Sequence, residues 1–189
     1  MISAGFMIWS IITIVVIMAM IAAYNSFVVK RNNVDNALSA VDTQLKLRFD
    51  LIPNLVATVQ TYAKHESETL SKITAYRSHA MDPGTSIVER MECGTAVSGL
   101  MHNIMLQLER YPVLQANTNF IHLQRTLNEI EAQLSAARRT YNAAATEYNT
   151  SIQLFPNCIF ASLFHFARRP LFEAADEDRK NPDVKKLFS

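Results

Sequence analysis

The sequence predicts an all-α protein in which an N-terminal transmembrane helix is followed by an antiparallel, up-and-down four-helix bundle. Three observations carry this prediction. The first 29 residues contain no charged side chain. The stretch from Phe120 to Ile152 repeats apolar and small residues every three or four positions. Turn-forming residues separate this stretch from three earlier helical segments of similar length, which suits a bundle joined by short turns.

The predicted span is the apolar run of residues 2–23. About 22 residues at 1.5 Å each give roughly 33 Å, enough to cross a hydrocarbon core of about 30 Å. A cleaved signal peptide is the alternative, but the basic segment expected before such a peptide is missing. Because Lys30 and Arg31 follow the span, the positive-inside rule predicts an inner-membrane protein with its N-terminus outside and its C-terminal domain in the cytoplasm. The lipid bilayer is therefore an expected partner.

After the span, an apolar helical stripe continues without glycine or proline as far as Pro53. Pro53 lacks a backbone N–H and disfavours helical geometry at Ile52. Either the helix kinks at Pro53, or a second helix starts there with Asp50 as its cap. The next stripe extends from Asn54 to about His79.

Turn and capping signals delimit the third helix. Asp82-Pro83-Gly84 is the strongest turn signal in the chain. The sequence from Ser86 to Glu89 has the pattern of a capping box that opens a helix, and Tyr111-Pro112 closes it. Gly94 and Gly99 lie inside this helix, and each costs about 1 kcal/mol relative to alanine unless close packing requires it.

The last helix is long and is capped by the Asn-rich residues 116–119. Its seam consists of Phe120, Leu123, Leu127, Ile130, Leu134, Ala137, Tyr141, Ala144, Tyr148 and Ile152. A mean spacing near 3.5 residues favours left-handed, coiled-coil-like packing. Leu127 and Leu134 are expected in the core, and Tyr141 and Tyr148 are expected there with their hydroxyls at the bundle edge.

These elements divide the chain into an anchor (residues 1–26), a helical bundle (27–155) and a C-terminal tail (156–189) with an apolar segment and a charged end. The apolar segment, Cys158 to Phe172, is too short to cross a bilayer. Two interpretations remain open. Its aromatic side chains enter the lipid interface while Arg168 and Arg169 meet anionic headgroups, or the aromatics fold back over the open end of the bundle.

Several short motifs occur along the chain in a fixed order: Tyr24-Asn25-Ser26, the run from Gln44 to Val56, Tyr62 to Glu66, Tyr111-Pro112, Phe120, Leu123-Gln124, Ala137-Arg138-Arg139, Tyr141-Asn142, Tyr148-Asn149 and Phe155-Pro156. In order and spacing these motifs resemble the signature of the LemA family of bacterial membrane proteins. The resemblance covers about residues 24–172. The chain departs from it at Ala132 and Gln133 and between Met91 and Met105. It implies a membrane anchor, an antiparallel four-helix bundle and no established enzymatic activity.

No pattern in the sequence nominates a chemical site. A di-iron site in a helical bundle needs a Glu three residues before a His, and none of the five histidines has one. Cys93 and Cys158 are far apart with no CxxC pattern, which fits two small apolar side chains in a reducing compartment, and a disulfide between them is the alternative. His65, beside Glu66 and Glu68, is most simply part of a mixed-charge helix surface. We expect no catalytic residue, no cofactor and no metal.

A net charge of +1 gives no basic field for nucleic acid. We therefore expect a membrane-anchored, non-enzymatic module that binds a protein partner, associates with itself or organises the membrane. Two alternatives remain. A homo-oligomeric structural protein that shapes an internal membrane would show an exposed apolar strip. An enzyme with an unrecognised site would bury several ionisable groups on facing helices.

Overall fold

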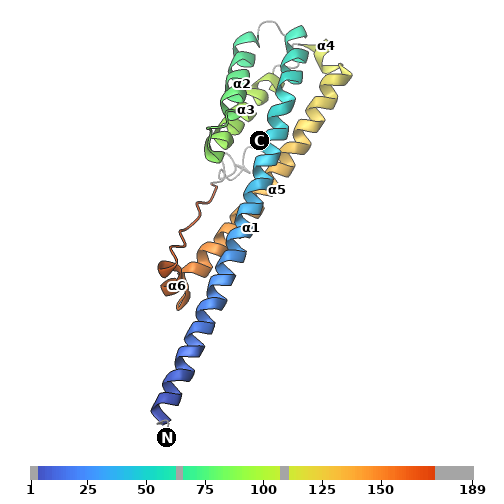
Figure 1. The fold of residues 1–189 in the computed structure, drawn as a ribbon. Helices are drawn as coiled ribbons and strands as arrows, with labels where there is room; N and C mark the ends of the chain where they lie inside the picture. The colour runs from blue at the N-terminus through green and yellow to red at the C-terminus, as the bar shows by residue number, and fades with distance from the viewer. Residues whose placement is uncertain (1–3, 63–65, 107–110, 173–189) are drawn as a thin grey trace, which may run out of the picture. The chain divides into compact units, whose positions relative to one another are not determined.

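The computed structural model describes residues 4–62, 66–106 and 111–172. Most of the described residues are helical and none of them is in a strand, so the all-α prediction is confirmed (Figure 1). The helices are α1 (Ala4–Tyr62), α2 (Ser67–Ala80), α3 (Ile87–Leu106), α4 (Pro112–Gln115), α5 (Thr118–Gln153) and α6 (Asn157–Leu163). Two compact units divide the chain. One combines residues 1–34 with residues 141–189, and the other is residues 35–140.

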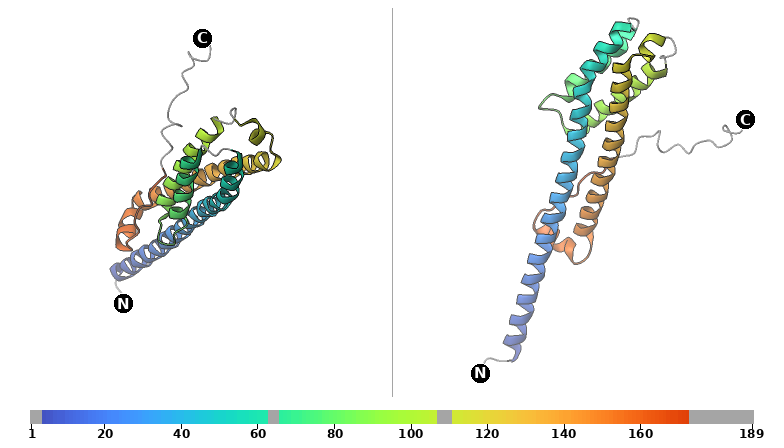
Figure 2. Two further views of the ribbon diagram at one scale, coloured as in Figure 1. Left: turned by 90° about the horizontal axis from the view of Figure 1, so that it is seen from above. Right: turned by 90° about the vertical axis from the view of Figure 1, so that its right-hand side faces the viewer.

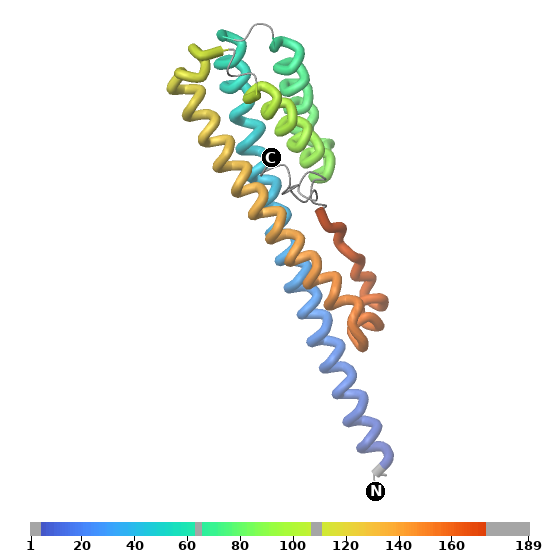
Figure 3. The backbone as a smooth tube through the Cα atoms, turned by 180° about the vertical axis from the view of Figure 1, so that it is seen from behind, coloured from blue at the N-terminus to red at the C-terminus, as the bar shows by residue number. Residues whose placement is uncertain are grey.

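The unit of residues 35–140 has a continuous apolar core. Its fully buried large side chains come from α1, α2, α3, α4 and α5 and include Val41, Leu45, Phe49, Ile52, Leu55, Val59, Leu70, Ile73, Val97, Leu114, Phe120 and Leu134. On α1 these residues recur every three or four positions, which places them on one face of the helix. Helices α2 and α3 pack against each other, as the further views show (Figures 2 and 3).

Helix α1 continues through Pro53 and ends at Tyr62. The helix start proposed at Pro53 is therefore wrong, and so is the capping role of Asp50, which lies exposed inside α1. The reason is a replacement donor. Pro53 has no N–H to offer the carbonyl of Phe49 four residues earlier, and Arg77 of α2 donates its Nε–H to that carbonyl at 2.9 Å. Phe49 is only 1% exposed, so this acceptor would otherwise be buried without a partner.

The predicted turn before α3 and the predicted N-terminal caps of α3 and α5 are confirmed. The predicted end of the third helix at Tyr111-Pro112 is wrong, because α3 ends at Leu106 and Pro112 begins α4. The N–H of Gly84 donates to the Asp82 carboxylate at 2.9 Å. At the start of α3, the Ser86 N–H donates to the Glu89 carboxylate at 2.8 Å and the Glu89 N–H donates to the Ser86 hydroxyl at 3.3 Å, which is the reciprocal pattern of a capping box. Asn117 caps α5, because its side-chain oxygen accepts the Phe120 N–H at 3.0 Å.

The two glycines of α3 differ in their surroundings. A Cβ at Gly94 would lie 3.2 Å from Leu45 Cδ2, so the missing side chain permits a close approach between α3 and α1. A Cβ at Gly99 would meet nothing within 4 Å. Close packing therefore accounts for Gly94 but not for Gly99.

The seam of α5 is only partly as predicted. Phe120, Ile130, Leu134, Tyr141, Tyr148 and Ile152 are buried. Leu127 is only half-buried, so its assignment to the core was wrong. Near the end of the helix Ala145 is buried while Ala144 is half-buried. The buried positions on both sides of this pair, Tyr141 and Tyr148, are the predicted ones, so the seam differs from the prediction there by one residue only.

In the unit of residues 1–34 and 141–189, most side chains in the N-terminal part of α1 are exposed. Among the described residues, α1 is the one helix that is long and apolar enough to cross a membrane. Its large apolar side chains from Phe6 to Ile21 are exposed, apart from the half-buried Met20, and Trp9 is the most exposed of them. Burial begins at Phe27, which is fully enclosed. The apolar stretch therefore does not serve as a core helix of this unit.

Candidate functional site

Helix α5 carries two Tyr-Asn pairs, Tyr141-Asn142 and Tyr148-Asn149, that hold an extended segment of the chain, residues 166–172. The Tyr148 hydroxyl donates to the Ala167 carbonyl at 3.0 Å, and the Tyr141 hydroxyl donates to the Pro170 carbonyl at 2.8 Å. The two asparagines make paired hydrogen bonds with the backbone of the segment. We call these four α5 side chains the Tyr–Asn ladder.

Each asparagine binds both polar groups of one residue. The Asn149 amide donates to the Arg169 carbonyl at 2.8 Å and accepts the Arg169 N–H at 2.8 Å. The Asn142 amide donates to the Phe172 carbonyl at 2.8 Å and accepts the Phe172 N–H at 2.9 Å. An asparagine side chain offers a donor and an acceptor side by side, so it can replace a neighbouring strand. The extended segment therefore has hydrogen-bond partners although no sheet is present around it.

The spacing of the ladder matches the rise of the segment that it holds. Seven residues of α-helix advance about 10.5 Å at 1.5 Å per residue. Three extended residues advance about 10 Å at roughly 3.3 Å per residue. The tyrosines contact carbonyls three residues apart, Ala167 and Pro170, and the asparagines bind residues three apart, Arg169 and Phe172. One heptad of α5 thus corresponds to three residues of the segment, and the two run in opposite directions.

The sharp turn before the segment is set by the end of α6. His165 has a positive φ of 57°. The Phe166 N–H donates to the Ala161 carbonyl at 2.9 Å, and the His165 N–H donates to the Ser162 carbonyl at 3.2 Å. These two bonds around a left-handed residue form a Schellman motif, which ends the helix and redirects the chain. The segment leaves α6 in the direction that the ladder requires.

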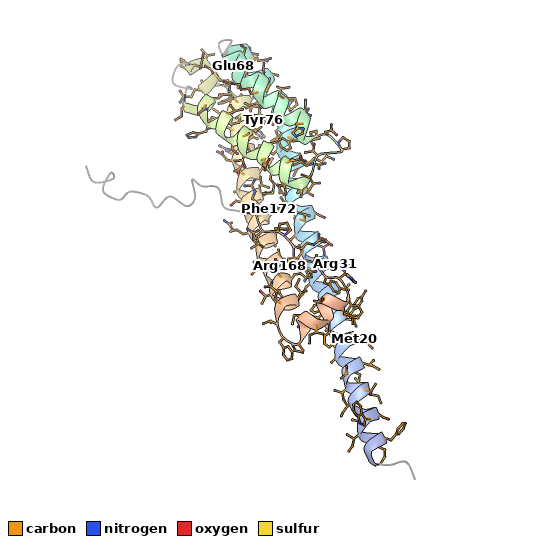
Figure 4. All side chains as sticks on the ribbon, turned by 90° about the vertical axis from the view of Figure 1, so that its left-hand side faces the viewer. Met20, Arg31, Glu68, Tyr76, Arg168 and Phe172 are labelled. Atoms are coloured by element: carbon orange, nitrogen blue, oxygen red, sulfur yellow. The ribbon has the colours of Figure 1, made fainter. Side chains whose placement is uncertain are left out.

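Aromatic side chains hold the segment at both ends, and Figure 4 labels Arg31 near one end and Phe172 at the other. Phe166 makes edge-to-face contacts with Tyr24 and Phe27 of α1, at ring-centroid distances of 5.8 and 5.3 Å. The Arg31 guanidinium lies 5.7 Å from the Phe166 ring centroid, a cation–π arrangement. At the other end, the Phe172 ring lies 4.4 Å from the Tyr141 ring. These aromatics of the predicted tail therefore fold onto helices α1 and α5.

Apolar residues of α6 and of the turn before it are exposed. Ile159 and Leu163 are 57% and 61% exposed, and their four-residue spacing places them on one side of α6. Phe155, in the turn before α6, is 82% exposed. Phe164 lies against Tyr24 with ring centroids 5.1 Å apart. The tail thus has two faces, one packed on α1 and α5 and one exposed strip, which we call the α6 strip.

Arg48 is the buried charge of the unit of residues 35–140. Its guanidinium lies 2.7 Å from the Glu131 carboxylate and donates to the Ser98 hydroxyl. Burial lowers the pKa of Arg48, and the Glu131 carboxylate opposes that change. Among the described residues no other charged side chain is buried. One ion pair that links α1 to α5 has the character of a structural contact rather than of an acid–base site.

The other residues considered from the sequence do not assemble into a site. His65 lies outside the described residues. Glu68 pairs with Lys72 at 2.6 Å, and the hydrogen bond from Lys72 lowers the pKa of Glu68. Cys93 and Cys158 are free thiols. Within the described ranges, no group of three or more His, Cys, Asp or Glu side chains is placed to hold a metal ion.

Sequence reasoning placed Tyr141 and Tyr148 correctly as buried residues with outward hydroxyls, but it assigned no role to Asn142 and Asn149. The sequence does contain a signal for the two asparagines. An identical Tyr-Asn dipeptide recurs after seven residues, so both asparagines lie on one side of α5, next to the seam. What the sequence does not contain is the identity of the segment that these side chains hold.

Comparison with known proteins places these residues in a family context. The family model described as the LemA family matches residues 37–185, which include the whole ladder. Protein LemA of Metamycoplasma hominis is 27% identical over 164 residues, covering 86% of this chain and 74% of the relative. Magnetosome protein MamQ 2 of Paramagnetospirillum magneticum is 24% identical over 193 residues, covering 88% and 71%. Neither name denotes an enzyme.

Proposed function

Because the chain belongs to the LemA family, we propose that it is a single-pass, membrane-anchored helical module that has no enzymatic activity and acts by binding a protein partner or itself. The observation that carries this proposal is the transition within α1. An exposed apolar stretch passes, without a break in the helix, into a buried position at Phe27. A helix that is apolar all round is either buried in a protein core or embedded in a membrane, and this stretch is not buried.

In this proposal, residues 1–26 are the anchor, residues 27–155 form an antiparallel four-helix bundle with coiled-coil-like packing, and residues 156–189 are the tail. The long helices α1, α2, α3 and α5 supply the four members of the bundle. Lys30 and Arg31, at the end of the apolar stretch, support an inner-membrane orientation with the N-terminus outside and the bundle in the cytoplasm.

We further propose that the α6 strip contacts the lipid interface. Phe164, at the end of α6, contacts Tyr24, which lies in α1 directly after the predicted span of residues 2–23. Helix α6 therefore lies beside the end of the apolar stretch. Phe155, Ile159 and Leu163 are exposed there, and Arg168 stands close to them in the chain with its side chain exposed. Apolar side chains beside basic ones are typical of segments that lie in the membrane surface.

Labelling of single cysteines with an impermeant maleimide tests the topology. In a chain carrying Cys93→Ala and Cys158→Ser, a cysteine at Ser3 should react in spheroplasts, from which the outer barrier has been removed. A cysteine at Asn128, an exposed position of α5, should react only after lysis. Reaction of the Asn128 position before lysis contradicts the orientation, and release of the protein from membranes by alkaline carbonate contradicts the anchor.

A second candidate function is a homo-oligomeric structural protein that shapes an internal membrane. The α6 strip favours it, because exposed apolar strips also mark contacts between protein copies. The two candidates differ at Ile159. A cysteine at this position forms intermolecular disulfides in oxidised membranes if strips of two copies meet, and it remains monomeric if the strip contacts lipid. Asn128→Cys serves as the matched exposed control.

A further inference from the structure

The side chains of the Tyr–Asn ladder form hydrogen bonds with the backbone of the segment that they bind. Six hydrogen bonds join the ladder to backbone N–H or carbonyl groups of described residues between 167 and 172. Proline is accepted at position 170 because the ladder bonds only to the carbonyl of this residue and requires no N–H there. Side-chain recognition comes from two aromatic anchors, Phe166 and Phe172, six positions apart, and from the Arg168 guanidinium, which donates to the Gln153 side-chain oxygen of α5 at 3.1 Å. The ligand class is therefore an extended peptide with aromatic residues at this spacing.

We propose that the ladder is a peptide-binding site and that its occupant in trans is the tail of a second copy of this chain. Every copy carries the matching segment, which already sits in the site in cis. When two copies exchange their tails, each tail makes with the other chain the same contacts that it gives up in its own chain. Exchange of such an element is therefore a low-cost route to a dimer. The inference specifies self-association within the proposed function, and it does not depend on the membrane anchor.

The connection between α5 and the segment favours release of the tail. Helix α6 has a single fully enclosed residue, Ala161, and its apolar strip is bare. The segment itself is held mainly by the ladder and the two aromatic anchors. A tail that leaves its own α5 therefore loses few contacts other than those that the α5 and α1 of a second copy restore.

Complementation between two defective full-length chains tests the exchange. The first variant, Asn142→Ala with Asn149→Ala, has a disabled ladder and an intact tail. The second, Phe166→Ala with Phe172→Ala, has an intact ladder and a disabled tail. Differently tagged copies are co-expressed, solubilised in detergent and captured through one tag. Because detergent replaces the membrane, this assay can fail independently of the proposed topology.

Only the mixed pair combines an intact tail and an intact ladder on different chains, so the first variant should capture the second several-fold more than it captures itself. Asn36→Ala with Asn128→Ala replaces two exposed asparagines elsewhere on α1 and α5. This control variant should show no enrichment with the second variant beyond that of the wild type. Equal capture in all pairings, or no capture of the mixed pair, overturns the exchange.

Peptide binding tests the site without relying on dimer formation. A fluorescent peptide of residues 165–172 should bind the full-length Phe166→Ala, Phe172→Ala variant more tightly than the wild type, whose own tail occupies the ladder. Ester bonds in place of the amides of Arg169 and Phe172 remove the two N–H donors. Each should weaken binding about fivefold, the ratio that corresponds to one typical net hydrogen bond.

An ester at Arg168 is the matched control, because the Arg168 N–H donates to none of the described residues. It should leave the affinity unchanged. If the doubly substituted ester binds as tightly as the parent peptide, or if the wild type and the anchor variant bind the parent peptide equally, the backbone-reading site is wrong.

Discussion

The passage of α1 through Pro53 depends on Arg77, and this dependence predicts a coupling between the two residues. Replacing Arg77 by Met keeps most of the apolar stem but removes the donor to the Phe49 carbonyl. Because Phe49 is almost fully enclosed, the orphaned carbonyl should cost about 1–3 kcal/mol of the free energy of unfolding, the usual penalty for a buried group without a partner. The substitution Pro53→Ala restores a backbone N–H four residues after Phe49.

The coupling is measured with a double-mutant cycle on the full-length chain in detergent micelles, from urea unfolding followed by circular dichroism. In the Pro53→Ala background, Arg77→Met should cost less than half as much as in the wild type. The interaction free energy should therefore be about 1 kcal/mol or more. Arg125→Met replaces an exposed arginine of α5 and should change stability by less than about 0.5 kcal/mol in either background.

Additive effects would refute the proposed replacement of the missing donor. If Arg77→Met costs the same within about 0.3–0.5 kcal/mol with proline or alanine at position 53, the two residues do not share an acceptor. Loss of α-helical signal around residue 53 in the Arg77 variant alone, seen as fast amide exchange at residues 50–56, would support the same mechanism independently.

Three further predictions follow from burial and capping. Leu134→Ala should lower the free energy of unfolding by about 2–5 kcal/mol in urea titrations, whereas Leu127→Ala, at a half-buried site, should cost clearly less. Gly99→Ala should raise the melting temperature by relieving a helix cost of about 1 kcal/mol, and Gly94→Ala should gain less because a neighbour must move. Capping bonds lower the pKa of Glu89, so its stabilising contribution is present above the ordinary carboxyl pKa and is lost as the pH falls through the lowered one. Glu89→Gln should reduce that loss in acid unfolding curves.

Helix class, capping and turns were predictable because each follows from residues close together in the sequence. Ser86 and Glu89 lie three positions apart, and Asn117 lies three positions before the residue that it caps. The consequence of Pro53 was not predictable in this way. It depends on Arg77, which is distant in the sequence and belongs to another helix. Local rules give the cost of a proline in a helix but not the presence of a replacement donor.

The candidate site shows the same limit. Tyr141 and Tyr148 were identified as buried residues from the seam, since burial follows from periodicity. The ladder requires in addition that residues 166–172 run antiparallel to α5, and that direction is set by the turn at His165. A left-handed residue at the end of a seven-residue helix has no strong sequence signal when it is not glycine. The pairing of Asn142 and Asn149 with the tail therefore emerged only from the structure.

The depth of three positions in reconstituted liposomes tests the proposed anchoring most directly. Fluorophores are attached to single cysteines at Ile14, in the apolar stretch of α1, at Ile159, in the α6 strip, and at Asn128, on the exposed side of α5. Nitroxide lipids that carry the quencher deep in the bilayer should quench the label at Ile14 most strongly, and headgroup-labelled lipids should quench the label at Ile159. Both should leave the label at Asn128 unaffected. Quenching at Ile14 that is no greater than at Asn128 would contradict the membrane anchor.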